Sequence, residues 1–334
     1  MRDVLATAFL ETTDWANAQR SFLAGDASDR SYQRLRLGTK TAVLMDAPPG
    51  TADDPANFAH IATHLRHLGI SAPAILGSDF SNGFLVIEDL GDGLYTQLIA
   101  ENPAMELPMY LAATDVLIRV AQGPAPSNLA CLTAQDWAHA ACFALDWYAF
   151  GVTSDPVDTG DFRQELMRLL HQHANAAPVT ILRDYHADNL LWLPARKGLA
   201  RVGVLDFQLA QLGQPGYDLV SLLQDARRDV SHEVQQACID RFVAQSEFDA
   251  AEFERAYAVL GVQRALRIMG VFARLCMVQE KPTYLKLLPR VWADLERNLT
   301  HPVLAHLAQI CARLLPDPTP ENIKKIGAQC GRHR

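Results

Sequence analysis

The stretch that decides the fold reads TILRDYHADNLLWL over residues 180–193, followed after a short gap by RVGVLDFQ over residues 201–208. An acid, Asp184, follows a first apolar run, and an amide, Asn189, comes five residues later. A second apolar run follows the amide, and a third ends at another acid, Asp206. Short apolar runs bounded by polar residues are typical of strands. The pattern therefore predicts a hairpin with an acid and an amide before it and a second acid at its end.

These three side chains have the chemistry that phosphoryl transfer needs. A carboxylate must orient the acceptor hydroxyl and take its proton, and Asp184 is the candidate. Magnesium prefers hard oxygen donors, so Asn189 and Asp206 are candidate ligands, with phosphate oxygens completing the shell. The alternative is that the two acids only form turns or cap helices. An acid and an amide at this spacing are common by chance, but the Asp206-Phe207 pair one hairpin later makes the pattern specific.

The residues before this stretch predict a small α+β lobe. We expect helices over about 3–18 and 54–68, and strands over 31–37, 41–46, 74–77 and 83–88. From about residue 94 the apolar spacing is mostly helical, apart from a strand-rich segment over about 179–206. We therefore expect an N-terminal sheet lobe over residues 1–92 and a larger helical lobe over residues 93–334. The tail after Pro316 is expected to be loosely held.

Composition excludes several classes of protein. With 334 residues, 49% of them hydrophobic and 20% charged, the chain can bury a large core. Its net charge of −8 disfavours nucleic acid or an anionic membrane as the main partner. No apolar run of about 18 residues occurs, which argues against a membrane span, and the N-terminus lacks the apolar core of a signal peptide. The six cysteines form no CxxC pair, so we expect reduced thiols and a cytoplasmic location.

With these motifs in place, the sequence resembles the protein-kinase-like fold and, within it, the aminoglycoside and choline phosphotransferase branch. Residues 182–189 and 206–208 look like its catalytic and metal loops. Further stretches narrow the likeness: GDAS at 25–28, VLMDAPP at 43–49, LVIEDLG at 85–91, YDLVSLLQDA at 217–226, GVQR at 261–264 and GVFARL at 270–275. Together they resemble bacterial kinases that phosphorylate the anomeric hydroxyl of N-acetylmuramate and N-acetylglucosamine in cell-wall recycling. The likeness covers about residues 3–315.

The resemblance implies ATP and Mg²⁺ as cofactors, with the N-terminal lobe binding the nucleotide. It implies a phosphate-covering turn over residues 25–30 and an interlobe hinge over residues 87–90, whose backbone reads adenine. The nucleotide-binding residues implied in this way are Gly25, Ala27, Ser28, Arg30, Glu88 and Leu90. Asp218 is implied to brace the catalytic loop, although an ordinary helix N-cap is an equally good interpretation.

The sequence departs from the kinase pattern in one important place. The third strand, over residues 42–46, carries no lysine to hold the nucleotide phosphates. Arg30 and Arg34 are the candidate replacements, and either could instead be a solvated charge on a strand face. Asp206 is followed by Phe207 and Gln208, and Gln208 restricts the backbone more than the usual glycine does, so we expect no large flip of this loop.

The acceptor is predicted from fewer residues. Gln263, Arg264 and Arg267 lie on one expected helix, with the two arginines three positions apart and so on one face. A bidentate arginine suits the carboxylate of N-acetylmuramate. The alternative is salt bridging between helices of the C-terminal lobe. His186 and Gln208, within the catalytic and metal motifs, are further candidates for contact with the acceptor.

The sequence thus predicts a kinase that phosphorylates a small molecule with a hydroxyl group, with an N-acetylated amino sugar as the first choice of acceptor. Two alternatives stay open. One is a phosphotransferase for an aminoglycoside-like or choline-like metabolite, which needs an acidic pocket, with Asp225, Asp229 and Glu233 as candidates. The other is a nucleotide-binding regulator without turnover, suggested by the missing lysine. The sequence does not decide the oligomeric state, and a monomer is compatible with it.

Overall fold

The computed structural model describes residues 1–25, 30–51 and 53–333. The chain forms two compact units, one made of residues 1–129 and 182–210 and the other of residues 130–181 and 211–334. The chain therefore enters the first unit twice, and the stretch with Asp184 and Asp206 folds with the N-terminal sheet. The predicted lobes, 1–92 and 93–334, divide the chain differently and stay a prediction.

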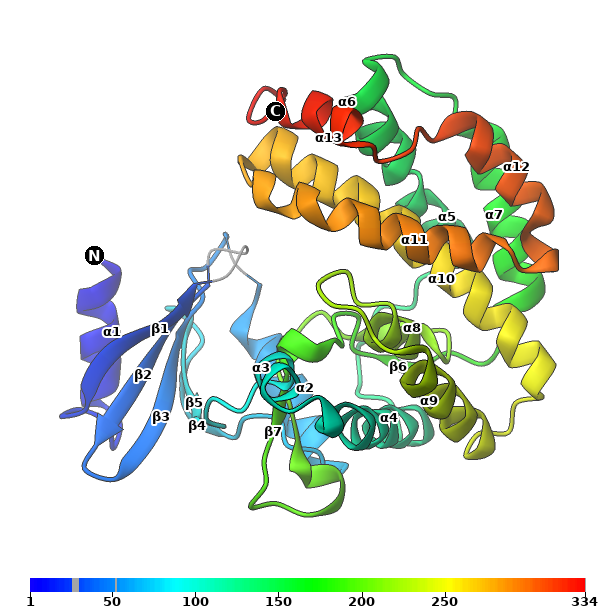
Figure 1. Cartoon of the computed structure of the whole chain (residues 1–334). Coiled ribbons are helices and arrows are strands. Elements are labelled where there is room, and N and C mark those ends of the chain that lie inside the picture. The colour runs from blue at the N-terminus through cyan, green and yellow to red at the C-terminus, as the bar shows by residue number, and fades with distance from the viewer. Residues whose placement is uncertain (26–29, 52, 334) are drawn as a thin grey trace. The chain divides into compact units, whose positions relative to one another are not determined.

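The first unit is built on a five-stranded antiparallel sheet with the strand order β1-β2-β3-β5-β4 (Figure 1). The strands of this sheet are β1 (Gln19–Gly25), β2 (Ser31–Leu37), β3 (Lys40–Asp46), β4 (Ile75–Asp79) and β5 (Phe84–Glu88). The helices of the unit are α1 (Arg2–Glu11), α2 (Pro55–His67), α3 (Tyr95–Glu101) and α4 (Glu106–Gln122), and a separate hairpin consists of β7 (Leu190–Trp192) and β8 (Val202–Val204).

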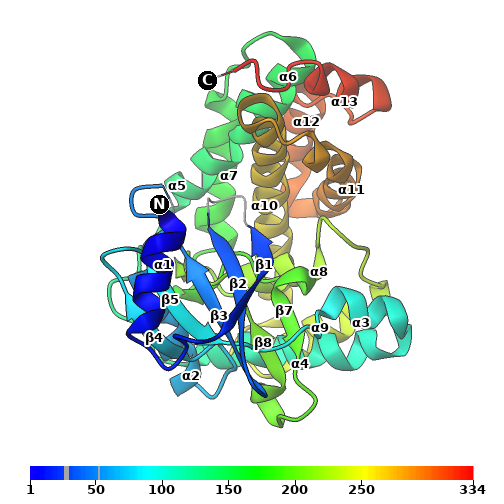
Figure 2. The same cartoon turned by 90° about the vertical axis from the view of Figure 1, so that its left-hand side faces the viewer.

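The two faces of this sheet have different neighbours. Helix α1 runs along one face (Figure 2), where its Phe9 packs in a buried cluster with Leu44 of β3 and Val86 of β5. Successive residues of a strand point to opposite faces, so Val43 and Ile87, which pair across β3 and β5, lie on the other face. That face carries the pocket described below.

The predicted helix over residues 3–18 is wrong in its second half. Helix α1 ends at Glu11, because the hydroxyls of Thr12 and Thr13 donate to the carbonyls of Phe9 and Leu10 and compete with continued helix formation. The chain then enters β1, a strand that the sequence did not predict. Strand β1 is an edge strand whose residues are nearly all exposed, so it lacks the alternation of buried and exposed positions that makes a strand recognisable.

The second unit is mostly helical, in agreement with the predicted α+β class. Its helices are α5 (Ala134–Ala141), α6 (Phe150–Thr153), α7 (Gly160–His173), α8 (Tyr217–Leu223), α9 (His232–Ala244), α10 (Ala250–Gln279), α11 (Leu288–Leu299), α12 (Ala305–Leu314) and α13 (Pro320–Gly327), and β6 (Val179–Ile181) pairs with β9 (Gln211–Gly213). The long helix α10 lies beside α11 (Figure 1). It is long and apolar enough to cross a membrane, but 72% of its most apolar window is buried inside the protein, as in the core helix of a soluble protein.

Two further expectations about this unit need correction. Strand β9 lies beyond the predicted strand-rich segment. The tail after Pro316 is not loosely held, because it forms α13 and buries Ile326 completely. The backbone N–H of Gly331 also donates to the carbonyl of Cys276 on α10. A docked terminal helix of this kind is ordered by tertiary packing, which proline content alone does not reveal.

Candidate active site

A pocket of about 420 Å³ opens in the first unit, a size typical of small-molecule sites. Apolar side chains form much of its wall, among them Val43 of β3 and Ile87 of β5, with Leu205 after β8. Asn189 and Asp206 provide polar groups in the same wall. The pocket therefore combines apolar surface for a flat ring with oxygen donors for a cation.

The loop that carries Asp184 is held firmly in the first unit. Tyr185, which is buried, donates its hydroxyl to the carbonyl of Ala113 on α4 at 2.9 Å. Arg183 has a φ of 73° and Asp206 a φ of 57°, so both adopt the left-handed conformation that side chains with a Cβ rarely take. Strained residues of this kind concentrate at functional sites, because the surrounding structure has to hold them in place.

Hydrogen bonds bring the three predicted residues together. The side-chain nitrogen of Asn189 donates to the backbone carbonyl of Asp184 at 2.9 Å. The backbone carbonyl of Asn189 accepts from the N–H of Leu205, the residue before Asp206, at 2.9 Å. Leu190 pairs with Val204 in the β7–β8 hairpin, and this register of the two strands places Asn189 next to Leu205. The side-chain nitrogen of Asn189 is thus engaged by the backbone carbonyl of Asp184. The side-chain oxygen of Asn189 remains to coordinate a cation.

Asp206 lies among buried partners. Its Oδ1 accepts from Arg30 Nη2 at 2.8 Å and from the amide nitrogen of Gln208 at 2.8 Å. The neighbouring Phe207 is fully buried and stacks on Phe58 of α2, with ring centroids 4.8 Å apart. This stacking fixes the segment after β8 against α2, so the carboxylate of Asp206 has a defined position.

The donor set fits magnesium. Within residues 1–25, 30–51 and 53–333, no group of three or more His, Cys, Asp and Glu residues could hold a metal by itself. Asn189 and Asp206 instead supply one amide oxygen and one carboxylate, both in the pocket wall. Magnesium usually takes few protein ligands and completes its shell with water and phosphate oxygens. These two residues are therefore suited to hold the ion together with a nucleotide.

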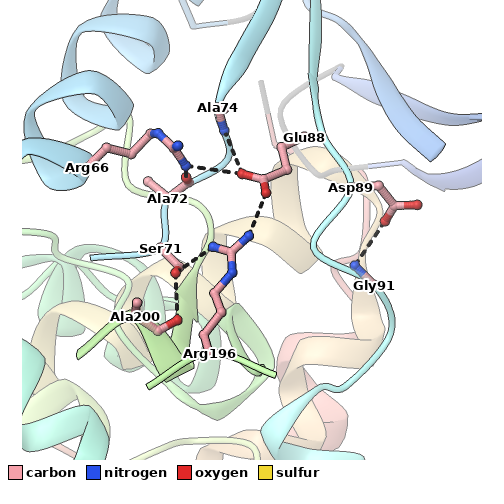
Figure 3. Close-up of polar contacts among 9 residues, drawn as sticks. All are labelled: Arg66, Ser71, Ala72, Ala74, Glu88, Asp89, Gly91, Arg196 and Ala200. Carbon is pink, nitrogen blue, oxygen red and sulfur yellow. Dashed lines mark hydrogen bonds and ion pairs between the residues drawn. The ribbon is translucent and has the colours of Figure 1, made fainter. Parts of the chain in front are cut away.

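Glu88, predicted to bind the nucleotide, lines the pocket, but its carboxylate is used elsewhere (Figure 3). It accepts from Arg196 at 2.5 Å, from Arg66 at 3.1 Å and from the backbone N–H of Ala74 at 3.2 Å. Arg196 also donates to Ser71 Oγ at 2.6 Å. The side chain of Glu88 thus ties the end of β5 to α2 and to the β7–β8 connection, and its backbone N–H already donates to the carbonyl of Ala74 at 2.8 Å.

The two candidate replacements for the missing lysine lie in different parts of the pocket region. Arg34 on β2 pairs with Asp89 and Asp92, each at 2.8 Å. Its hydrogen bond holds the pKa of the Asp92 carboxyl below the usual range, and the pKa of Arg34 itself is raised by the same bond. Arg34 is therefore committed to the segment after β5, whereas Arg30 lies against the candidate metal ligand Asp206.

The remaining predicted nucleotide-binding residues are only partly described. Gly25 and Leu90 line the pocket, and Leu90 packs with Leu191 and Leu193. Ala27 and Ser28 lie outside the described residues. Their contact with a nucleotide stays a prediction.

Asp218 does not cap its helix. The N-cap of α8 is Gly216, and Asp218 lies buried in the first turn, so the interpretation of Asp218 as an N-cap is wrong. Its role in bracing the catalytic loop stays a prediction.

The predicted acceptor residues are mostly buried. Gln263 donates to the carbonyl of Trp137 at 2.9 Å, and Arg264 donates to Ser221 Oγ at 2.7 Å inside the helical packing. Arg267 is half-buried on the same helix, α10. His186 is buried, with its Nε2 3.3 Å from the side-chain nitrogen of Asn189. The part that these residues and Gln208 take in acceptor binding stays a prediction.

Comparison with known proteins shows the family of this chain. The model of the phosphotransferase enzyme family matches residues 19–259. The chain belongs to this family. An N-acetylmuramate/N-acetylglucosamine kinase of Caulobacter vibrioides is 36% identical over 95% of this chain and 98% of its own. A kinase of the same name from Pseudomonas aeruginosa is 30% identical over 87% of each chain. A choline/ethanolamine kinase family protein from Mesorhizobium loti has the same fold, with a TM-score of 0.64 at 14% identity, over 98% of this chain and 100% of that one.

Membership in the phosphotransferase enzyme family confirms the predicted α+β kinase-like fold and implies that this phosphotransferase uses a nucleotide.

Sequence reasoning missed Asp53, whose carboxylate lies 3.5 Å from the side-chain nitrogen of Gln208. It also missed Arg66 and Arg196, which bind Glu88. None of these three belongs to a local motif, so only the folded chain brings them against Gln208 and Glu88.

Proposed function

We propose that this protein is an ATP- and Mg²⁺-dependent kinase that phosphorylates N-acetylmuramate and N-acetylglucosamine at the anomeric hydroxyl. The observation that carries the proposal is the 36% identity to a relative of that name over nearly the whole of both chains. The meeting of Asp184, Asn189 and Asp206 in one unit supports it, because this set suits phosphoryl transfer. We further propose that the enzyme is cytoplasmic.

Each of the three residues has a proposed role. Asp184 orients the acceptor hydroxyl and takes its proton, which makes the oxygen a better nucleophile. Asn189 and Asp206 hold magnesium, which neutralises charge on the phosphates when it is bound. The walls of the pocket, including Val43 and Ile87, shield the adenine ring from water, and the backbone of residues 87–90 reads its edge.

Two of the three carboxylates considered for a cationic acceptor, Asp225 and Asp229, already have hydrogen-bond partners. Asp229 is held by Arg290 through two bonds, of 2.7 and 3.1 Å. Asp225 is buried and accepts from the backbone of Arg227. Carboxylates with such partners offer little attraction to an aminoglycoside or choline. An amino sugar without positive charge is therefore the better candidate.

The proposal is tested by offering the purified protein ATP, magnesium and a panel of amino sugars, aminoglycosides and choline, and examining the products by phosphorus NMR. We expect phosphate coupled to the anomeric proton of both N-acetylated sugars. Phosphate at C6, or turnover of another acceptor only, contradicts the proposal. ATP binding without turnover of any acceptor favours the regulator.

A second experiment examines the acceptor arginines. If Arg267 binds the carboxylate of N-acetylmuramate, Arg267→Ala raises the KM for that sugar by about 10- to 100-fold and leaves N-acetylglucosamine nearly unchanged, since only the former carries the charge. Arg264→Ala is the comparison, because its guanidinium already bonds Ser221. Equal loss for both sugars in the Arg267 variant removes this residue from the carboxylate site.

A further inference from the structure

Four side chains from three segments meet beside the candidate metal site. Arg30, directly before β2, is only 4% exposed. Its Nη2 lies 2.8 Å from Asp206 Oδ1, and its Nη1 lies 4.0 Å from Asp53 Oδ2. Gln208 donates to Asp206 Oδ1 at 2.8 Å and approaches Asp53 at 3.5 Å. Arg30 therefore faces two carboxylates, one predicted to bind metal and one not.

Arg30 and a divalent cation that binds Asp206 Oδ1 compete for the same atom. Oδ1 of Asp206 already accepts two hydrogen bonds, from Arg30 and Gln208. A cation that binds this oxygen replaces at least one of them, and repulsion between like charges makes the arginine the one to leave. Asp53 is the nearby acceptor for it. A movement of about 1 Å brings the guanidinium from 4.0 Å to hydrogen-bond distance.

We propose that Arg30 is an exchangeable counter-ion of the active site. It neutralises Asp206 while no metal is bound, and it shifts to Asp53 and to the nucleotide phosphates when a divalent cation binds Asp206. Arg30 thereby takes the place of the lysine that β3 lacks, and Asp53 is the positioning residue that keeps it in reach. This inference rests on the proposed function, because it assumes a nucleotide in the pocket.

The choice of arginine follows from this double task. A guanidinium has five donors in a rigid fork, so it can bind a carboxylate on one edge and phosphate oxygens on another. It also stays charged when buried. An isolated buried cation is costly, whereas one with a carboxylate partner in both states is never left uncompensated.

The test measures metal and nucleotide binding separately, because the proposal predicts effects of opposite sign. Arg30→Gln removes the competing charge, so Mn²⁺ alone, followed by electron paramagnetic resonance of the free ion, binds about 3- to 10-fold more tightly. The same variant binds a non-hydrolysable ATP analogue with Mg²⁺ about 10- to 100-fold more weakly in calorimetry, since charge-assisted bonds to phosphate are lost. Arg36→Gln is the matched control. It removes the same charge from an exposed position on β2, the strand that follows Arg30, and leaves both affinities unchanged.

Two further variants separate this role from a structural one. Asp53→Asn weakens the binding of both the nucleotide analogue and Mn²⁺, because it removes the carboxylate to which Arg30 moves when a cation binds Asp206. Arg30→Lys keeps the charge and restores part of the nucleotide affinity. Weaker Mn²⁺ binding by Arg30→Gln, or unchanged nucleotide affinity in a folded Arg30→Gln, overturns the exchange. Failure of the wild-type protein to bind any nucleotide overturns the proposed function instead, and the Mn²⁺ measurement then stands by itself.

Discussion

The carboxylate of Glu88 connects the wall of the candidate nucleotide pocket to two arginines, and this connection gives a quantitative prediction. Glu88→Gln, Arg196→Met and the double variant form a thermodynamic cycle. The cycle measures the coupling energy between the two side chains, because the changes in unfolding free energy that each single substitution causes are subtracted. A second cycle, with Glu88→Gln, Arg66→Met and their double variant, measures the coupling between Glu88 and the other arginine.

The expected energies follow from distance and exposure. Arg196 lies 2.5 Å from Glu88, with side chains 33% and 27% exposed, and it is also held by Ser71. Arg66 lies 3.1 Å from Glu88 and is 42% exposed. Exposed ion pairs contribute about 0.2–1 kcal/mol, and partly buried, well-oriented ones contribute more. We therefore expect a coupling of about 1–1.5 kcal/mol for Arg196 and about 0.5 kcal/mol for Arg66.

The assay is urea unfolding of the purified variants, at low salt and at about 1 M NaCl. Salt weakens the coupling of both pairs, and more so that of the more exposed Arg66. Nucleotide kinetics give a second measurement. Because residues 87–90 line the pocket, Arg196→Met raises the KM for ATP by about 2- to 5-fold and leaves kcat within about twofold.

Three results would refute this reasoning. One is a coupling between Glu88 and Arg196 below about 0.3 kcal/mol, within the error of additive substitutions. Another is a larger coupling for Arg66 than for Arg196. The third is a fall in kcat with unchanged KM, which would move the effect of the network from nucleotide binding to the chemical step.

Three further predictions concern catalysis, pH and packing. Asp184→Asn lowers kcat by about 10²- to 10⁴-fold and leaves nucleotide affinity unchanged, because the proton acceptor is lost and the shape kept; more than a tenth of wild-type turnover contradicts the role. A hydrogen bond from Arg168 lowers the pKa of Glu165 in the folded protein below its ordinary value of 4.5. The stabilisation that Glu165 provides is therefore complete above pH 4.5 and is lost as the pH falls through the lower pKa of the folded protein. Glu165→Gln therefore lowers the free energy of unfolding in urea at pH 6, and a deficit that does not shrink as the pH is lowered below 4.5 contradicts this assignment. Gly270→Ala places a Cβ 2.1 Å from the backbone of Phe143 and lowers the free energy of unfolding in urea by about 3 kcal/mol. In the control Gly327→Ala the nearest atom is 3.7 Å from the new Cβ, and the free energy of unfolding changes by less than about 1 kcal/mol. Equal effects of the two substitutions refute the packing argument.

Local signals in the sequence determined much of the catalytic motif. Asp184, Asn189 and Asp206 were predicted as a group, and the structure joins their segments through hydrogen bonds to backbone carbonyls around one short hairpin. Strand β2 agrees with its prediction at both ends, and α2 agrees to within a residue. These features depend on the alternation of apolar residues, on caps and on tight turns, which act between neighbours in the chain.

The partners of the charged side chains were decided only by the tertiary structure. Arg30 and Asp206 are 176 positions apart, and Arg196 and Glu88 are 108 apart. No periodicity relates such pairs, because their contact depends on which strand ends and connections the fold brings together. The edge strand β1 and the docked helix α13 were missed for a related reason. An exposed edge has no alternation of burial, and a terminal helix is held by the surface on which it packs. Sequence patterns thus determined the candidate reacting groups of this protein, whereas long-range packing decided which charges surround them.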